Sequence, residues 1–322
     1  MWWQRILRPR VVIPVLLSAA LLAFVFSLSN ISQVLAYILS ISLATMAIVF
    51  ALTVVYLALK WVQFQRYLGK EGIVATWRQS LLSFAVGEMT LPIPAGIYAQ
   101  NYVLRTTACA DFSRSSAATT AILAMEAIVS LLIVGIVNIP EWSWLRPLIL
   151  GLFAAAAVVV TLFLRVTPLR DRAGQLLQSG PLEKLGPEFI ETIEGIRDLF
   201  RPRVAAVALV IAAVYLLSLV AGFFMTAHGM GIEQLTFQQA VTIYLFAIAV
   251  EELLPLSSNL GVIEAGGVAA AQAWGYSFTE GLAMMLGFRL IWTGTVWLVG
   301  GAIILLLRGE FGGRCDTDID RR

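Results

Sequence analysis

Six blocks of the sequence are apolar over the length that an α-helix needs to cross a lipid bilayer. The hydrocarbon core is about 30 Å thick and takes roughly 20 helical residues to cross. Because lipid cannot satisfy exposed backbone groups, such blocks must be helical. Charged residues make up only 13% of the 322 positions, about half the share of a soluble domain. The sequence therefore predicts an all-α polytopic membrane protein with six full spans, namely Val11–Leu28, Leu39–Leu59, Ala117–Val137, Pro147–Leu164, Val204–Thr226 and Gly281–Leu307.

Basic residues fall in groups that alternate with connectors lacking Lys and Arg. The groups include Arg5–Arg10, Lys60–Arg78, Arg165–Arg203 and Arg308–Arg322, whereas the connector Ser29–Gln33 carries no basic residue. Cytoplasmic loops carry the excess of Lys and Arg. The pattern predicts a multi-pass protein of the cell (inner or plasma) membrane with both termini cytoplasmic. The first apolar block is expected to be a retained span and not a cleaved signal peptide.

Two further apolar stretches, residues 79–105 and 237–275, are interrupted by proline and polar residues. Proline removes a helix hydrogen bond and clashes with the preceding turn, so each helix must break. The arm Gln79–Thr90 would reach only about 18 Å, too short to cross the core. We expect two re-entrant broken-helix hairpins, the first entering from the cytoplasm and the second from outside. Charge leaves open the alternative that each is a pair of thin full spans. The predicted turn residues are Pro92, Pro94, Gly96, Pro255, Asn259 and Gly261.

The order of the elements predicts two halves of opposite orientation. In each half a span, a hairpin and a returning span follow one another, and inverted repeats with broken helices are a recurring transporter architecture. The predicted division is an N-terminal span in residues 1–38, a first half in 39–164, a cytoplasmic linker in 165–203, a second half in 204–307 and a cytoplasmic tail in 308–322.

The linker contains an amphipathic pattern. Apolar residues recur at helical spacing from Phe189 to Phe200, and charged residues such as Glu191 and Arg197 occupy the other face. This spacing predicts an amphipathic helix. We expect it to lie on the inner membrane surface as a linker, and the alternative is a helix that docks a partner.

The two broken segments resemble signatures of a known family. The segment from Pro92 through Gly96 to Arg105, the segment Leu254–Ala265 and Arg289 in the last span are similar to the lysylphosphatidylglycerol synthase transmembrane family, also called flippase-like integral membrane proteins. The resemblance covers about residues 10–307 and implies a role in moving lipids between leaflets. Some members carry a soluble aminoacyltransferase domain after the membrane part, and we expect this chain, which stops at Arg322, to lack that synthase.

Some positions depart from the family pattern. Where the family usually has Glu and, three residues later, Arg, this sequence has Ile97 and Gln100, and the Glu-Arg pair expected in the next span is Glu126-Ala127. These departures predict that the chain belongs to a divergent branch of the family, which handles a different or less charged lipid.

Ionisable side chains at membrane depth cost about 2.5–3.5 kcal/mol each on insertion scales, so they need a partner or a purpose. We expect Arg289 to pair with Glu264 or Glu252 and to line a groove for a lipid headgroup; the alternative is an ion pair that only locks hairpin to span. Gln100 and Asn101 are expected either to contact substrate or to satisfy the broken helix. The candidate substrate-binding residues are Glu126, Glu251, Glu252, Glu264, Arg289, Gln100 and Asn101, with Glu88 as a further buried acid.

No nucleotide-binding loop, His/Cys metal cluster or well-placed His for a nucleophile is found in the sequence, so we expect no catalytic residue, metal or cofactor. The first hypothesis is a flippase-like transporter that moves a lipid or lipid-linked headgroup between leaflets. One alternative is an integral-membrane transferase acting on lipid substrates, with Glu251 and Glu252 as its only acidic pair. Another is a non-catalytic subunit of a lipid-synthesis complex. The expected partners are membrane lipids and a possible lipid-synthesis enzyme, not nucleic acid.

Overall fold

The computed structural model describes residues 27–93, 95–136, 151, 186–253 and 261–312. This part of the chain contains helices and connecting turns but no strands, which confirms the predicted all-α fold. The helices are α3 (Ile31–Leu39), α4 (Leu43–Lys70), α5 (Trp77–Thr90), the 3₁₀ helix η1 (Gly96–Tyr98), α6 (Ala99–Thr107), α7 (Phe112–Ile136), α10 (Gly186–Leu199), α11 (Pro202–Gly229), α12 (Phe237–Leu253), α13 (Val262–Ala273), α14 (Phe278–Leu306) and the 3₁₀ helix η4 (Arg308–Gly312).

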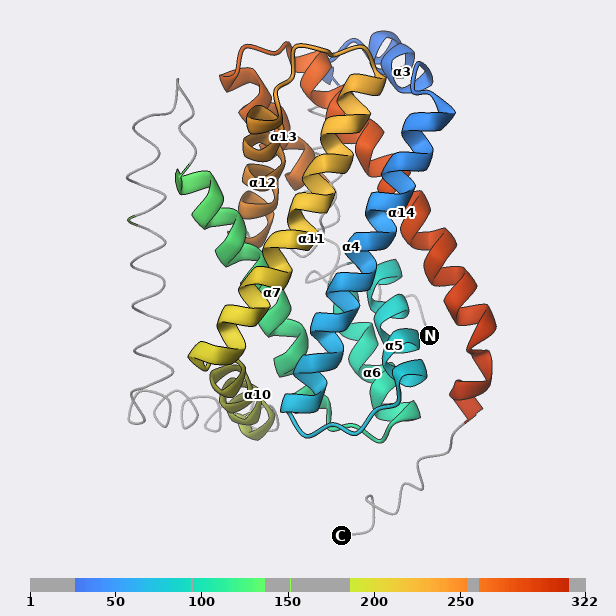
Figure 1. Ribbon diagram of the computed structural model, residues 1–322, viewed down its shortest axis with the longest axis vertical. Helices are drawn as coiled ribbons and strands as arrows, with labels where there is room; N and C mark the ends of the chain where they lie inside the picture. Colours follow the sequence, from blue (N-terminus) through green and yellow to red (C-terminus); the bar gives the residue numbers. More distant parts are fainter. Residues whose placement is uncertain (1–26, 94, 137–150, 152–185, 254–260, 313–322) are drawn as a thin grey trace.

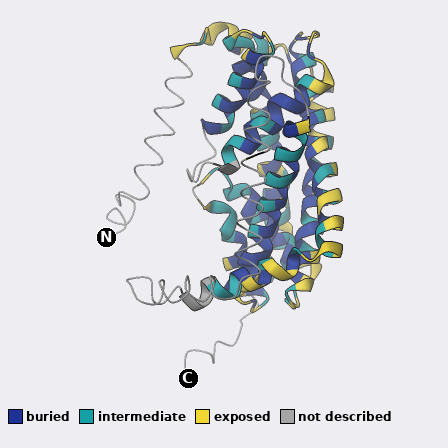
Figure 2. Cartoon of the chain, turned by 90° about the vertical axis from the view of Figure 1, so that its left-hand side faces the viewer, coloured by how far each residue is buried: buried dark blue, intermediate teal, exposed yellow. Residues whose placement is uncertain are grey.

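Four of the six predicted spans are confirmed as helices long and apolar enough to cross a membrane, namely α4, α7, α11 and α14. The other two, Val11–Leu28 and Pro147–Leu164, lie almost entirely outside the described residues. Large apolar side chains such as Leu298 and Val210 are exposed on the spans, as expected of helices that face lipid. Buried residues run along the inside of the bundle (Figure 2).

The short helix α3 was not predicted, because residues 29–33 carry no basic or strongly apolar pattern and were interpreted as a connector. Its first turn is fixed by the side chain of Asn30, whose Oδ1 accepts a hydrogen bond from the backbone N–H of Gln33 at 3.3 Å. Asparagine is a favoured N-cap residue for this reason. The sequence signal for this helix is therefore the polar N-cap residue Asn30 and not an apolar pattern.

The two broken stretches each form a pair of helices in one half of the bundle. The pair α5–α6 fills the lower half of the view and the pair α12–α13 the upper half (Figure 1). This is the placement expected of hairpins that enter from opposite faces. Each hairpin also contacts the other half of the chain, because α5 packs against α14 and α12 packs against α7.

Glycine is required at the turn of the first hairpin. A Cβ atom at Gly96 would collide with the backbone carbonyl of Thr90. The Thr90 hydroxyl donates to the Gly96 carbonyl at 2.7 Å, and Ala95 takes a left-handed conformation with φ of 56°. The chain thus reverses within a few residues after Pro92. Pro94 and residues 254–260 of the second turn lie outside the described residues.

The predicted amphipathic helix is confirmed as α10, which crosses the lower end of the bundle and docks on the protein (Figure 1). Its apolar residues Ile193 and Leu199 are buried against the neighbouring helices, mainly α7. The Thr192 hydroxyl donates to the Ser113 carbonyl at 3.2 Å.

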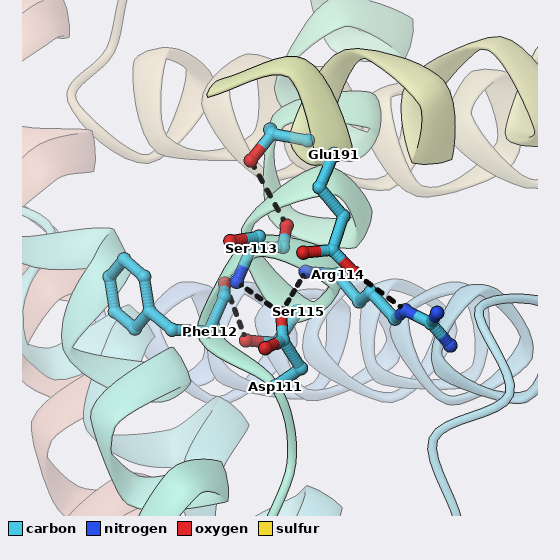
Figure 3. A network of polar contacts seen from close by, with 7 residues as sticks. Asp111, Phe112, Ser113, Arg114, Ser115 and Glu191 are labelled. Carbon is cyan, nitrogen blue, oxygen red and sulfur yellow. Dashed lines mark hydrogen bonds and ion pairs between the residues drawn. The ribbon is translucent and has the colours of Figure 1, made fainter. Parts of the chain in front are cut away.

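Polar contacts fix the start of α7 beside α10 (Figure 3). The Asp111 carboxylate caps α7 by accepting hydrogen bonds from the backbone N–H groups of Ser113 and Arg114 at 2.8 and 3.0 Å. The Arg114 guanidinium in turn pairs with Glu191 of α10 at 3.0 Å. The linker helix is therefore held by side chains of the bundle itself.

Gly195 allows α10 to pack closely against α7 and the end of α4. We expect Gly195→Ala to weaken this packing. A Cβ atom there would lie 2.7 Å from the Cβ of Ala117 and 2.6 Å from Glu71 Oε2. The control is Gly69→Ala, because a Cβ at that helical position meets nothing within 4 Å and alanine raises helix stability by roughly 0.5–1 kcal/mol over glycine. Thermal unfolding in detergent should give a lower Tm for the first variant and an equal or higher Tm for the second. A higher Tm for Gly195→Ala would contradict this packing.

Glu71 is the C-cap residue of α4 and lies beside α10. The ionisation of its carboxyl group makes a pH-dependent contribution to the stability of the fold. Burial, with the nearby carboxylates of Asp198 and Glu191, raises the pKa of the Glu71 carboxyl, and Arg114 partly offsets this shift. A raised pKa means that the folded state binds the proton more tightly, so this contribution to stability is present at low pH and is lost as pH rises.

We therefore expect Glu71→Gln to raise the Tm at about pH 7.5, with a difference from the unmodified protein that shrinks as the pH falls toward about 4.3, the ordinary value for Glu. The measurement is a series of thermal unfolding curves in detergent for both proteins. A difference that grew on acidification would show that the sign is wrong.

Candidate functional site

A cavity of about 360 Å³ lies between the turn of the first hairpin and the helices α12 and α14. The first hairpin contributes residues of its turn, including Gly96 and Tyr98, and the long helices contribute aromatic and charged side chains. The charged lining residues are Lys60, Glu126, Glu251 and Arg289, and the aromatic ones from the long helices are Tyr56, Tyr244, Phe288 and Trp292. The cavity thus combines an apolar wall with charges of both signs.

Lys60 ties three helices together at one side of this cavity. Its ammonium, from α4, lies 3.1 Å from Glu88 of α5 and 2.9 Å from Glu126 of α7. It also donates to the hydroxyl of Tyr56, one turn earlier on α4, at 2.8 Å. The Lys60 side chain is only 3% exposed and the Glu88 side chain 2%. A charge this deeply buried is tolerated because it is paired and hydrogen-bonded.

Sequence reasoning missed Lys60, which was assigned to a basic group at the membrane surface because the apolar block ends at Leu59. The structure corrects this: α4 continues to Lys70, so Lys60 lies about 15 Å before the helix end. A signal was present in the spacing of Tyr56, Lys60, Gln63 and Tyr67, which places four polar side chains on one helix face. A second signal was that Glu88 and Glu126 lacked an assigned cation.

Of the two predicted partners of Arg289, Glu264 forms the ion pair. The Arg289 guanidinium of α14 lies 2.6 Å from Glu264 Oε1 of α13. The other carboxylate oxygen accepts a hydrogen bond from the backbone N–H of Gly261 at 2.7 Å, which caps the start of α13. A carboxylate at a helix N-terminus is stabilised by the helix dipole. One side chain therefore fixes the broken helix and orients the arginine, of which 14% remains exposed.

The remaining candidates divide between the cavity wall and other places. Glu126 and Glu251 line the cavity. Gln100 and Asn101 do not: the Gln100 amide donates to Thr119 Oγ1 at 2.7 Å, and Asn101 donates to Ser116 Oγ at 3.1 Å. These two bonds join α6 to the side chains of α7, not to the broken backbone.

The structure describes some of the predicted turn residues and leaves others outside the described ranges. Gly96 lines the cavity, and Gly261 takes φ of 91°, which favours glycine. Pro92 lies in the turn after α5. Pro94, Pro255 and Asn259 lie outside the described residues, as does the side chain of Glu252.

The polar side chains at the cavity are mainly charged groups that can form hydrogen bonds. In the described ranges no three His, Cys, Asp or Glu side chains come together as a possible metal site. Lys60 and Arg289 provide N–H donors at the cavity, and the carboxylates of Glu126 and Glu251 provide acceptors. Charged side chains of both signs therefore line the same cavity beside aromatic surface.

Comparison with known proteins agrees with the resemblance found at the hairpins. Residues 11–300 match the family described as the lysylphosphatidylglycerol synthase TM region. No curated protein matches the chain. The family match covers most of the chain, including all of the cavity-lining residues.

Lys60 should be the residue on which stability of the central site depends most. Lys60→Met leaves Glu88 and Glu126 buried without their cation, and breaking a buried pair in this way costs about 3–5 kcal/mol. We expect that loss in denaturant unfolding in detergent, and recovery of most of it in the triple variant Lys60→Met, Glu88→Gln, Glu126→Gln. The exposed Lys70→Met is the control, with a change of about 0.5 kcal/mol or less. If the triple variant were no more stable than the single one, unpaired carboxylates would not be the cause.

Proposed function

Because the chain belongs to the family of the lysylphosphatidylglycerol synthase transmembrane region, we propose that it moves the polar headgroup of a lipid or lipid-linked molecule between the two leaflets of a cell membrane. The observation that carries the proposal is the cavity between the two hairpins, lined by Lys60, Glu126, Glu251 and Arg289. A polar headgroup crosses hydrocarbon only at a high cost in free energy. Charged and hydrogen-bonding groups halfway along the bundle would lower that cost.

The arrangement of the helices supports this mechanism. Along the chain α4 descends, the α5–α6 hairpin follows and α7 ascends, whereas α11 ascends, α12–α13 follows and α14 descends (Figure 1). Opposed halves with broken helices that meet at a central site suit alternating access. We assign the two halves as an inverted repeat and the helix pairs as re-entrant hairpins. Opening would alternate between the two ends of the cavity.

The distribution of basic residues supports an orientation. Lys70, Arg78, Arg114 and Arg203 lie at one end of the bundle, at or near the ends of α4, α5, α7 and α11. Positive loops stay on the cytoplasmic side, so we assign this end to the cytoplasm of a cell (inner or plasma) membrane, together with both termini. In this proposal the chain acts as a transporter without catalytic residues or a cofactor.

Arg289 and Glu264 provide the test, because Arg289 lines the cavity and its ion pair with Glu264 joins α13 to α14. The double variant Arg289→Gln, Glu264→Gln removes both charges and keeps side chains that can hydrogen-bond to each other. We expect lipid translocation to fall at least about tenfold, which is the scale of losing a hydrogen bond to a charged group. The measurement is the rate at which labelled lipid in liposomes becomes accessible to an impermeant bleaching reagent.

The matched control is Arg114→Gln, Glu191→Gln, which removes an exposed ion pair at 3.0 Å outside the cavity and should leave the rate unchanged. A folded cavity variant with an unchanged rate would contradict the proposal. Transfer of a group onto lipid without translocation would favour the transferase. Activity only after addition of a lipid-synthesis enzyme would favour the subunit.

A further inference from the structure

A second cavity, of about 220 Å³, lies between the last turns of α4 and the first turns of α11. It is separate from the central cavity and shares no lining residue with it. Its lining residues are Gln63, Arg66, Tyr67 and Lys70 from α4 and Arg203, Val204, Val207, Ala208 and Ile211 from α11. The basic members come from both helices and the apolar members from α11.

Three cations and no carboxylate line this second cavity. Arg66 and Lys70 are four residues apart and share a face of α4, where like charges repel each other. Arg203 adds a third positive charge from the facing helix. Among the described residues no ion pair is formed by Arg66, Lys70 or Arg203. Such a cluster favours an anion, which would relieve the repulsion.

Two further features favour an anionic group that also carries a hydrogen-bond donor. The cavity lies at the amino-terminal end of α11, which has Pro202 in its first turn and where the helix dipole is positive. Gln63 is only 1% exposed and lines the cavity, and its Oε1 has no hydrogen-bond partner. A carboxamide oxygen is an acceptor, so Gln63 Oε1 can accept a hydrogen bond from a headgroup hydroxyl, while Gln63 Nε2 donates to the Tyr67 hydroxyl at 3.5 Å.

The apolar wall indicates that the anion is attached to a hydrocarbon chain. Val204, Val207 and Ile211 follow one another along α11 and line the cavity. Val207 is 41% exposed, and Val210 on the outer surface of the same helix is 60% exposed. In a membrane such side chains face lipid tails. A free phosphate ion would gain nothing from this wall.

We propose that this second cavity binds the phosphate-bearing headgroup of an anionic phospholipid from the leaflet at the basic end of the bundle. Arg66, Lys70 and Arg203 contact the phosphate, and the acyl chains lie along α11. Basic cavities between spans at the cytoplasmic side are suited to such headgroups. This inference does not depend on lipid transport by the central cavity.

The test is binding of short-chain phosphatidylglycerol to the full chain in detergent, measured by titration and by native mass spectrometry. The double variant Arg66→Gln, Arg203→Gln should bind at least about tenfold more weakly. The control Arg78→Gln, Arg308→Gln removes the same charge from exposed positions outside the cavity and should bind as the unmodified protein does. Phosphatidylcholine and inorganic phosphate are titrated in parallel.

Preferred binding of phosphatidylglycerol that only the cavity variant weakens supports the proposal. Equal weakening in both double variants would show general attraction to basic residues and would overturn it. Inorganic phosphate that bound as tightly as the lipid would overturn the assignment to a lipid. Neither double variant changes a residue that lines the central cavity. Loss of lipid binding with unchanged translocation, or the reverse, therefore separates this proposal from the transport function.

Discussion

The central site is organised by one buried ammonium group. Lys60 is held by carboxylates from α5 and α7, so a helix of the first hairpin and a returning span are fixed to α4 through a single side chain. At membrane depth neither a lone lysine nor a lone glutamate is stable, and the three groups therefore constrain one another. Lys60 and Glu126 of this cluster also line the central cavity. The polar lining of the cavity and the contacts that hold these helices together thus depend on the same side chains.

The second hairpin uses a carboxylate in a related way. Glu264 binds Arg289 through one oxygen and the start of α13 through the other. A broken helix leaves backbone N–H groups without partners, and an acidic side chain three residues into the new helix satisfies one of them. The same acid then has a free oxygen for a cation on the neighbouring span. In both halves, an acidic residue on a hairpin helix pairs with a cation on a long helix.

Much of this arrangement could be predicted from the sequence, and the exceptions have physical reasons. Four of the spans and the two helix breaks could be predicted because apolar length and proline act locally. The partner of Arg289 could be narrowed to Glu264 or Glu252 because few charges lie deep enough to need a partner, and the structure shows Glu264. Lys60 was missed because an apolar block does not show where a helix ends, and a lysine at the border of a block has the same composition whether it is buried or at the surface. The contacts of Gln100 and Asn101 with α7 depend on packing between helices, which spacing within one helix does not reveal.

The helix α4 relates the two cavities. Tyr56 and Lys60 line the central cavity, and Gln63 and Tyr67 line the basic one. Lys60 and Gln63 are three residues apart, about 4.5 Å along the helix axis, and all four side chains are buried. Spacings of four, three and four residues keep them on one face. The facing surface of α11 is small at Ala208 and Ala212 and carries the buried Tyr215, whose ring packs edge-on against Tyr56 with 5.5 Å between the ring centroids. The polar face of α4 therefore runs without a break from the central cavity to the basic one, and it is buried where α4 packs against α11.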